Sequence, residues 1–283
     1  MNIQGKWSNG RWSGGIEWTR WIEPDGTVRP GYTWNPVGGC PHDCEWLMPD
    51  GNWTECYAKT VAEGAALKAF AHGFNHHYWR PHLLQKPVKL KETAGIFLDS
   101  MSDLMAATVP NEQIELVLSV CRQAYWHRFF VLTKNAPRLL KFPWPENCIV
   151  GVSMPPTMMH GSMLTLIQQK KYTARALEVL GELRGRGVTT WMSFEPLSWD
   201  VVPLVNDEPG VLDWAVIGAA SRGRTLYQPS AADVRGLLNV LDQQGVAVFF
   251  KGNLIWDSWR ETFPKHRVTA WGEREQQAES AAG

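Results

Sequence analysis

The 283-residue chain lacks a long uninterrupted apolar run, and it has no excess of charge of either sign. No stretch approaches the ~18 consecutive apolar residues of a membrane-spanning helix, so we expect no membrane contact. Residues 1–15 lack the apolar core of a signal peptide, which predicts a cytoplasmic protein. The 28 basic and 28 acidic side chains cancel to +0. This balance excludes a protein that coats nucleic acid through bulk electrostatics, but it is compatible with a local basic groove.

Cysteine is sparse and odd in number, which does not favour a disulfide framework. Three of the five cysteines, Cys40, Cys44 and Cys56, fall within 17 residues, whereas Cys121 and Cys148 stand alone. In a reducing compartment, clustered thiols are more often metal ligands or redox groups than disulfide partners. The cluster is therefore the first candidate for a functional site.

Internal repeats and low-complexity runs are also absent. With 44% hydrophobic and 20% charged residues, the composition is that of a globular protein. We expect a single domain over residues 1–273 that carries a cysteine-bearing loop at 33–58, followed by a flexible tail at 274–283. Tryptophan is unusually abundant, with 16 against 10 Phe and 6 Tyr, and seven of the 16 precede or lie inside the cysteine loop. These rings are expected either to shield an oxygen-sensitive centre or to pack one end of a barrel.

Short apolar runs alternate with longer amphipathic stretches along the chain. The expected strands are residues 95–99, 128–132, 148–152, 188–194, 212–217 and 246–250, with a poorly patterned first strand before Cys40. The expected helices are residues 111–125, 172–186 and 230–244. Strands that are nearly all apolar and that alternate with helices predict a parallel sheet. We therefore expect an α/β fold, a partial (β/α) barrel of about six or seven parallel strands, with a doubly wound open sheet as the alternative.

Polar or ionisable residues directly follow the expected strands, and in α/β folds chemistry gathers at the carboxyl ends of the strands. Lys134, Glu195 and Lys251 each follow a buried strand, which is a costly place for an unpaired charge. We expect these three side chains to converge on a ligand or on one another. Among the further polar residues at strand ends are Ser100, Ser153 and, in the segment 218–222, Arg222.

The cysteines lie in a loop rich in glycine and proline, between Thr33 and Ala58. Thiolates that converge from such a loop are metal ligands. Three of them suffice for three irons of a [4Fe–4S] cluster and leave the fourth iron open. With His42 or another residue as fourth ligand, the loop instead fits a structural zinc. Three unrelated free thiols are the remaining interpretation. Residues 57–67 are expected to form a helix whose N-terminus lies beside the metal centre.

Seven short motifs follow one another along most of the chain. They are TWNPVGGC…C…CYA (33–58), IFLDSMSDLM (96–105), VLTKNAPRL (131–139), GVSM (151–154), SFEPL (193–197), DWAVIGAAS (213–221) and FFKGN (249–253). In this order they resemble a family of phage and prokaryotic radical-SAM-like proteins of unknown function, which is distantly similar to spore photoproduct lyase. The resemblance extends from about Trp18 to Asn253 and rests on the shared order rather than on one motif.

The resemblance implies a barrel of the radical-SAM type, with a [4Fe–4S] cluster on Cys40, Cys44 and Cys56 and S-adenosyl-L-methionine on the open iron. The implied enzyme cleaves this cofactor to a 5′-deoxyadenosyl radical, which abstracts a hydrogen atom from the substrate. On this interpretation Tyr57, Ser100, Ser153 and Glu195 contact the cofactor. The catalytic or substrate-binding residues are Lys134, Glu195 and Lys251, with Arg222 as a further contact for an anionic substrate.

The implied partners are DNA or a nucleotide and an electron donor, with DNA base modification or repair as the reaction. A phage-encoded member would act in the host cytoplasm. Because the net charge is zero, DNA would be held by a local groove near Lys134 and Lys251. The alternative function is that of a non-enzymatic zinc-bearing nucleic-acid-binding protein, and a third is a family member that has kept the fold and lost the cofactor.

The chain departs from the radical-SAM pattern in two places. Eleven residues, 45–55, separate Cys44 from Cys56, whereas two residues are usual there. The strand end at 218–221 also lacks the Gly-Gly-Glu that is frequent among the relatives.

Overall fold

The structure is built around an eight-stranded sheet whose strands lie in chain order. The computed structural model describes residues 1–8, 11–23 and 25–266. From one edge to the other, the strands are β1 (Asn2–Gln4), β6 (Gly31–Trp34), β11 (Gly95–Leu98), β12 (Arg128–Thr133), β13 (Cys148–Ser153), β16 (Thr189–Phe194), β17 (Trp214–Ile217) and β20 (Ala247–Phe250). β1 is antiparallel to β6, and the seven strands from β6 to β20 are parallel. All the expected strands are therefore present, including the first one before Cys40.

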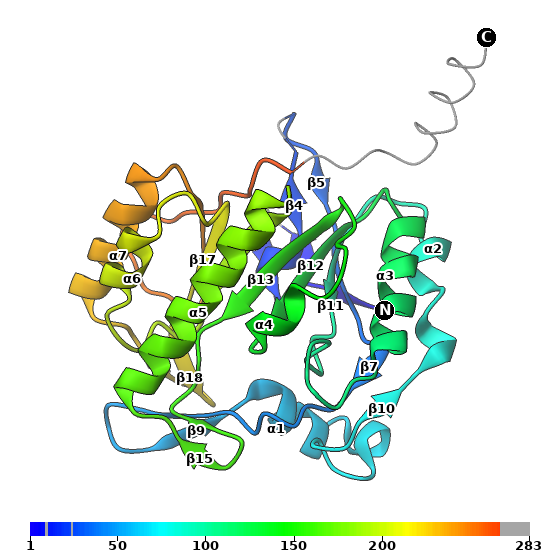
Figure 1. Ribbon diagram of the computed structural model, residues 1–283, viewed down its shortest axis with the longest axis horizontal. Coiled ribbons are helices and arrows are strands. Elements are labelled where there is room, and N and C mark those ends of the chain that lie inside the picture. The colour runs from blue at the N-terminus through cyan, green and yellow to red at the C-terminus, as the bar shows by residue number, and fades with distance from the viewer. Residues whose placement is uncertain (9–10, 24, 267–283) are drawn as a thin grey trace.

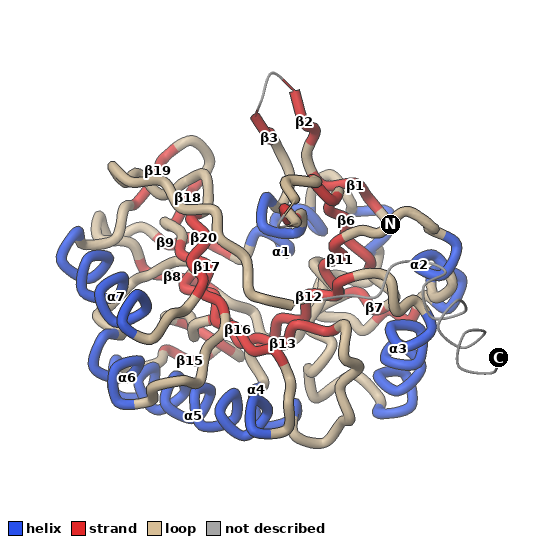
Figure 2. The backbone as a smooth tube through the Cα atoms, turned by 90° about the horizontal axis from the view of Figure 1, so that it is seen from above, coloured by secondary structure: helices blue, strands red, loops and turns tan. Residues whose placement is uncertain are grey.

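The sheet is curved, and a row of helices covers its outer face (Figure 2). These helices are α2 (Lys86–Lys89), α3 (Asn111–Gln123), α4 (Ala136–Leu139), α5 (Leu166–Gly185), α6 (Val202–Asp207) and α7 (Ala231–Gln243). Helix α1 (Tyr57–Glu63) is not part of this row: it lies below the strands in Figure 1 and, seen from above, within the curve of the sheet (Figure 2). A doubly wound sheet reverses its strand order and has helices on both faces. The expected partial (β/α) barrel is confirmed, and the open-sheet alternative is wrong.

Helix α5 begins six residues before its expected start at 172. Thr165 and Gln168 form a capping box there: Gln168 N donates to the Thr165 hydroxyl at 3.3 Å, and the Gln168 side chain accepts from Thr165 N at 2.8 Å. The first two helical residues, Leu166 and Ile167, are exposed. Hydrophobic spacing therefore did not mark this turn, because its apolar side chains do not face the core.

Large aromatic side chains fill the concave face of the sheet. Phe97, Trp191 and Trp214 belong to one buried cluster with Trp18. Trp18 comes from the 3-10 helix η1 (Glu17–Thr19) and packs edge-on, with its ring centroid 4.7 Å from that of Phe97 and 5.0 Å from that of Trp191. The rings leave the carboxyl ends of the strands as the place where the barrel is open to a ligand.

Short elements complete the described part of the chain. Two-stranded pairs are β2 (Lys6–Ser8) with β3 (Arg11–Ser13), β4 (Trp21–Ile22) with β5 (Val28–Arg29), β7 (Val37–Gly38) with β10 (Tyr78–Trp79), and β18 (Ala220–Arg222) with β19 (Thr225–Tyr227). A four-stranded sheet has the order β15 (Ser162–Met163), β14 (Met158–Met159), β8 (Glu45–Leu47) and β9 (Trp53–Glu55). Two further 3-10 helices are η2 (Leu67–Phe70) and η3 (Pro81–Leu83). The helix expected over 57–67 is α1 followed by η2.

None of the helices within the described ranges is long and apolar enough to cross a bilayer. The tail expected at 274–283 lies outside the described residues, so its flexibility stays a prediction, as does the domain boundary at 273.

We predict that Gly151→Ala destabilises the fold. A Cβ at Gly151, in the middle of β13, would lie 2.4 Å from the indole of Trp191, whose Nε1 donates to Val131 O at 2.9 Å. We expect the free energy of unfolding in urea to fall by about 1–3 kcal/mol, because the buried indole has no room to move. Gly185→Ala is the control, since a Cβ there meets no atom within 4 Å. Equal stability of the two variants would contradict the prediction.

Candidate active site

The strand-end residues meet at one edge of the sheet, around two adjoining pockets. The first, called here the cysteine pocket, is lined among others by Cys40, Cys44, Cys56, Asp99 and Asp103. The second, the barrel pocket, has a volume of about 200 Å³ and is lined among others by Trp18, Trp46, Ser193, Glu195 and Lys251. Six residues line both pockets: Cys56, Tyr57, Phe97, Leu132, Lys134 and Ser153. The two pockets are therefore neighbouring parts of one site.

A hairpin brings the second and third cysteines together. The residues between them form β8 and β9, which pair antiparallel with Glu45 opposite Glu55. At the base of the hairpin, Cys56 N donates to Cys44 O at 3.0 Å. The eleven-residue insertion therefore does not separate Cys44 from Cys56 in space, because the chain leaves along β8 and returns along β9.

Glycine allows the first cysteine to approach the same place. Gly39 has a φ of +81°, and a Cβ there would lie 1.8 Å from the carbonyl oxygen of His76. Gly39 N donates to Met101 O at 3.0 Å, and Cys40 N donates to Phe74 O at 2.8 Å. The Gly-Gly-Cys motif thus reflects a close backbone contact that a side chain at Gly39 would prevent.

Lys134 lies close enough to the three thiols to interact with them electrostatically. Burial raises the pKa of Cys44 to about 11 and raises the pKa of Cys40 further. Burial would lower the pKa of Lys134, but the negative charges of Cys44, Cys56, Cys40 and a neighbouring carboxylate outweigh it, so the pKa is raised above the ordinary lysine value. The Lys134 ammonium also donates to the Ser153 hydroxyl at 3.3 Å. Lys134 thus supplies positive charge where thiolates would need it.

Asp103 is a central residue of the site that the sequence analysis did not single out. Its Oδ2 accepts hydrogen bonds from the Thr133 hydroxyl and from Lys134 N, both at 2.9 Å, and lies 2.7 Å from His42 Nε2. Its Oδ1 accepts from Met105 N at 2.9 Å. Burial alone would raise the pKa of Asp103, but the bonds from His42, Lys134 and Thr133 lower it below the ordinary value. The one signal in the sequence was a second acidic residue, four positions after Asp99, at the same strand end.

Both ring nitrogens of His42 are engaged within the protein. Nε2 contacts Asp103, and Nδ1 lies 3.3 Å from Nε2 of His160. His42 therefore does not present a free nitrogen to the cysteines in this arrangement, as the structural-zinc interpretation would require.

Asp99 is a buried carboxyl group of the cysteine pocket. Asp99 Oδ1 accepts from Val37 N at 3.1 Å, and the nearby Ser102 hydroxyl also favours the charged carboxylate. Burial raises the pKa of Asp99 well above its ordinary value. Buried polar atoms are nearly always paired in native proteins. Asp99 and Ser102 therefore form a small polar group in the wall of the cysteine pocket.

Tyr57 and Ser100 belong to the site, but in different roles. The Tyr57 hydroxyl donates to Ser100 O at 2.6 Å, whereas the side chain is 54% exposed at the border of the two pockets. The Ser100 hydroxyl donates to Asn35 Oδ1 at 3.1 Å, and Asn35 Oδ1 also accepts from Met101 N. The Tyr57 ring is thus open to stacking, while Ser100 mainly holds the loop together.

Glu195 and Lys251 face each other in the barrel pocket. Lys251 Nζ lies 3.0 Å from Glu195 Oε1, and the Ser193 hydroxyl donates to Glu195 Oε2 at 3.0 Å. The charge of Glu195 raises the pKa of Lys251. The expectation that strand-end charges converge on one another is therefore met for this pair. Arg222 is exposed on β18 and lines neither pocket.

Within the described part of the chain, no three His, Cys, Asp or Glu side chains are grouped so that they could hold a metal ion. A [4Fe–4S] cluster makes a different demand from a single ion, because each thiolate binds its own iron atom. The role of the cysteines as ligands therefore stays a prediction.

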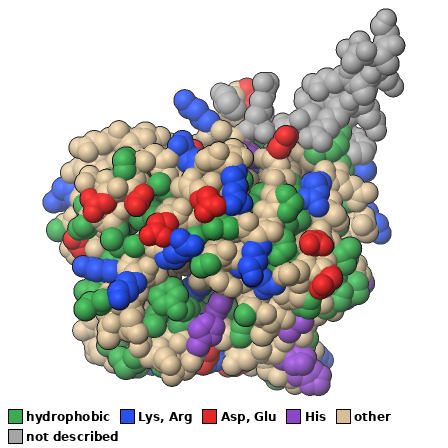
Figure 3. Space-filling model, in the orientation of Figure 1, with side chains coloured by type: hydrophobic (Ala, Val, Ile, Leu, Met, Phe, Trp, Pro, Cys, Tyr) green, Lys and Arg blue, Asp and Glu red, His purple; other side chains and the backbone are tan. Residues whose placement is uncertain are grey.

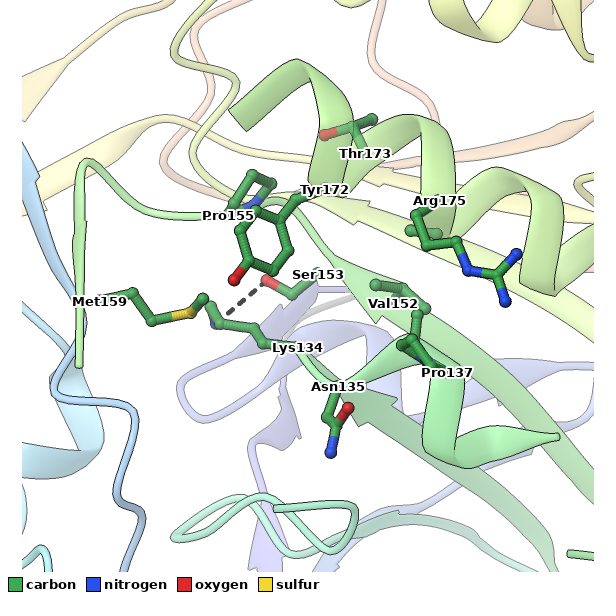
Figure 4. Close-up of a pocket in the computed structure, with 12 residues that line it drawn as sticks. Lys134, Asn135, Pro137, Val152, Ser153, Pro155, Met159, Tyr172, Thr173 and Arg175 are labelled. Atoms are coloured by element: carbon green, nitrogen blue, oxygen red, sulfur yellow. Dashed lines mark hydrogen bonds between the residues drawn. The ribbon is translucent and has the colours of Figure 1, made fainter. Parts of the chain in front are cut away.

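A third pocket lies on the other side of Lys134 and Ser153, between β13 and α5 (Figure 4). Tyr172, from α5, and Met159, from β14, line it together with the end of Lys134. The hydrogen-bonded Lys134 and Ser153 side chains thus border all three pockets.

Residues 15–280 match the model of a family described as protein of unknown function (DUF5131). The chain belongs to the DUF5131 family. No curated protein matches the sequence of this DUF5131 member.

Two structures of spore photoproduct lyase are similar to this DUF5131 chain at low identity. One is complexed with the dinucleoside spore photoproduct, at 11% identity over 91% of this chain and 72% of that chain. The other is a double mutant with bound AdoMet and the same dinucleoside, at 10% identity over 92% and 73%. The TM-score is 0.39 for both. At these values the likeness supports nothing about the activity of this protein.

We predict that Asp103→Asn lowers the free energy of unfolding by about 2–3 kcal/mol, because an amide nitrogen cannot accept the buried bonds that Oδ2 receives. Chemical denaturation measures this loss. The control is Asp207→Asn, at an exposed position on α6, which is expected to change stability by less than about 0.5 kcal/mol. A loss no greater than that of the control would show that Asp103 does not hold these segments together.

We also predict that the stability difference between wild type and Asp103→Asn depends on pH. The pKa of Asp103 is lowered in the folded state, so its contribution is complete above the ordinary value of 3.8 and is lost as pH falls towards the folded value. The stability difference between wild type and Asp103→Asn should be constant from neutral pH to about pH 5 and shrink below 3.8. A difference that grows on acidification would contradict this assignment.

Proposed function

We propose that this protein is a radical S-adenosylmethionine enzyme that holds a [4Fe–4S] cluster on Cys40, Cys44 and Cys56 and acts on a nucleic-acid base. One observation carries the proposal: three thiols from a folded loop line a single pocket at the carboxyl ends of a parallel half-barrel. The hairpin contact between Cys44 and Cys56 supports it, because it removes the apparent conflict between the long insertion and a shared metal centre.

The surroundings of the cysteines fit a cluster. Cys44 is buried and Cys40 and Cys56 are partly buried, and the Lys134 ammonium beside them would offset the negative charge of thiolates. Bound there, the cluster would supply the electron that splits S-adenosylmethionine into methionine and a 5′-deoxyadenosyl radical, which takes a hydrogen atom from the substrate.

The chain's own residues divide the remaining tasks. The exposed ring of Tyr57 is placed to stack on the adenine of the cofactor, at the border of the cysteine and barrel pockets. Asp99 and Ser102 are polar residues in the wall of the cysteine pocket, where a polar group of the cofactor would meet them. Ser153 and Glu195 present further oxygens towards the barrel pocket, while Ser100 contributes less than expected because its hydroxyl already donates to Asn35.

The barrel pocket is proposed to receive the substrate. Trp46 gives it aromatic surface for a flat base, and Lys134 and Lys251 supply positive charge. The Lys134 ammonium lies 5.7 Å from the centroid of the Trp46 ring. Because the chain as a whole is neutral, DNA would be held by this local charge rather than by a basic surface.

We predict that the three clustered cysteines, and not the isolated ones, are needed for iron. After anaerobic reconstitution, the wild type should be brown, absorb near ~400 nm and contain about four iron atoms per chain. Cys40→Ala, Cys44→Ala and Cys56→Ala should each lose most of this iron and colour. Cys121→Ala is the control, because Cys121 is buried in α3, outside both pockets.

Two results would overturn the cluster. One is a Cys40→Ala protein that still binds iron stoichiometrically. The other is a colourless wild type with one zinc per chain, which would support the zinc-bearing nucleic-acid-binding protein instead.

We further predict that the reduced, iron-loaded protein releases 5′-deoxyadenosine from S-adenosylmethionine, and that DNA changes the rate. Chromatography of the products, with and without DNA, measures both effects. The Cys44→Ala variant should release none. An iron-loaded wild type that releases no 5′-deoxyadenosine would identify a member that has kept the fold and lost the activity.

A further inference from the structure

Exposed hydrophobic side chains gather where β15 leads into α5. Met163 is 63% exposed, Leu166 50% and Ile167 68%, all within five consecutive residues. On the face shown in Figure 3, hydrophobic and basic side chains gather at the lower left, where α5 begins. Proteins rarely expose apolar groups side by side unless the surface binds something.

Two lysines border these apolar residues. Lys170 and Lys171 follow Leu166 and Ile167 by four residues each, so they lie on the same side of α5, one turn further on. Both are exposed, and neither forms an ion pair with any described residue. The five residues Met163, Leu166, Ile167, Lys170 and Lys171 are called here the α5 patch. It is an apolar surface with a cationic border.

The segment that leads into the α5 patch contacts the region of the second cysteine. Residues 158–160, just before the patch, contact the chain on both sides of Cys44. His160 N donates to His42 O at 2.6 Å, and Met158 pairs with Glu45. Beneath the patch, Met159 is buried in one cluster with Cys44, and Leu164 packs against that cluster. A short path of packed side chains therefore leads from the α5 patch to the proposed metal ligand.

We propose that the α5 patch is the docking surface for a small acidic electron-transfer protein, which delivers its electron towards Cys44. The inference rests on the proposed function. In each event one electron leaves the reduced partner and arrives at the metal centre, so the partner is oxidised and the centre reduced. Short-lived redox complexes use small interfaces with complementary charge, as the apolar surface and its lysine border would provide.

Other occupants fit the α5 patch less well. A second copy of this chain would bring two cationic borders together, which costs free energy. A single-stranded nucleic acid would match the lysines, but Met163, Leu166 and Ile167 offer no aromatic face for stacking. An acidic protein matches both parts of the surface.

The first experiment measures binding of a purified acidic flavodoxin to the reconstituted protein. We expect binding to weaken with salt, and the affinity to fall roughly ten-fold or more in Ile167→Glu and in the double variant Lys170→Glu/Lys171→Glu. The matched controls are Leu116→Glu on α3, where the side chain is 49% exposed, and Lys86→Glu/Lys89→Glu on α2. Thermal unfolding verifies that every variant is folded.

The second experiment compares two reductants. Dithionite needs no docking surface, so dithionite-driven release of 5′-deoxyadenosine should be equal in wild type and α5-patch variants, whereas flavodoxin-driven release should be lost in the variants. Equal flavodoxin affinity in patch and control variants would overturn the docking surface, as would an α5-patch variant that changes the oligomeric state or DNA binding instead. Absence of release with dithionite in every protein would contradict the proposed function, and the binding measurement would still judge the docking surface by itself.

Discussion

The site depends on one buried carboxylate. Asp103 belongs to the turn after β11, and its oxygens accept bonds from the end of β12 and contact the ring of His42 in the cysteine loop. Three segments that are distant in sequence are therefore joined at one atom, Oδ2. Lys134 takes its place beside the thiols because its own backbone N–H is one of the donors. A charge-assisted contact of this kind is strong because it is shielded from water.

The curved sheet divides the molecule into a packed part and an open part. Aromatic rings from the strands and Trp18 fill the concave face, and the polar strand ends surround the space that remains. Burial accounts for part of the tryptophan excess: Trp18, Trp191 and Trp214 are buried in the concave face, and Trp34 is buried in the larger core that the helices share. These tryptophan rings pack in the interior of the protein. Trp46, in contrast, borders the site next to Lys134.

Local patterns in the sequence predict the strands of the sheet well. They do not predict the solvent-facing start of a helix or a contact between residues distant in the chain. Buried parallel strands are apolar on both faces, so each strand stood out as a short apolar run between turns. The start of α5 was placed six residues late because Leu166 and Ile167 face solvent, and hydrophobic spacing reports only the side that faces the core. Asp103 was passed over because its importance comes from His42, Thr133 and Lys134, which are not its neighbours in the chain.

The sequence by itself determined the strand and helix alternation, the parallel half-barrel and the clustering of three cysteines, because each of these follows from residues close together in the chain. Only the tertiary structure decided that Cys44 and Cys56 meet across a hairpin, that Glu195 pairs with Lys251, and that Arg222 lies outside the pockets. Such contacts depend on how the sheet curves and on which strand ends it brings together. Those are properties of the packed chain, which no single segment of the sequence carries.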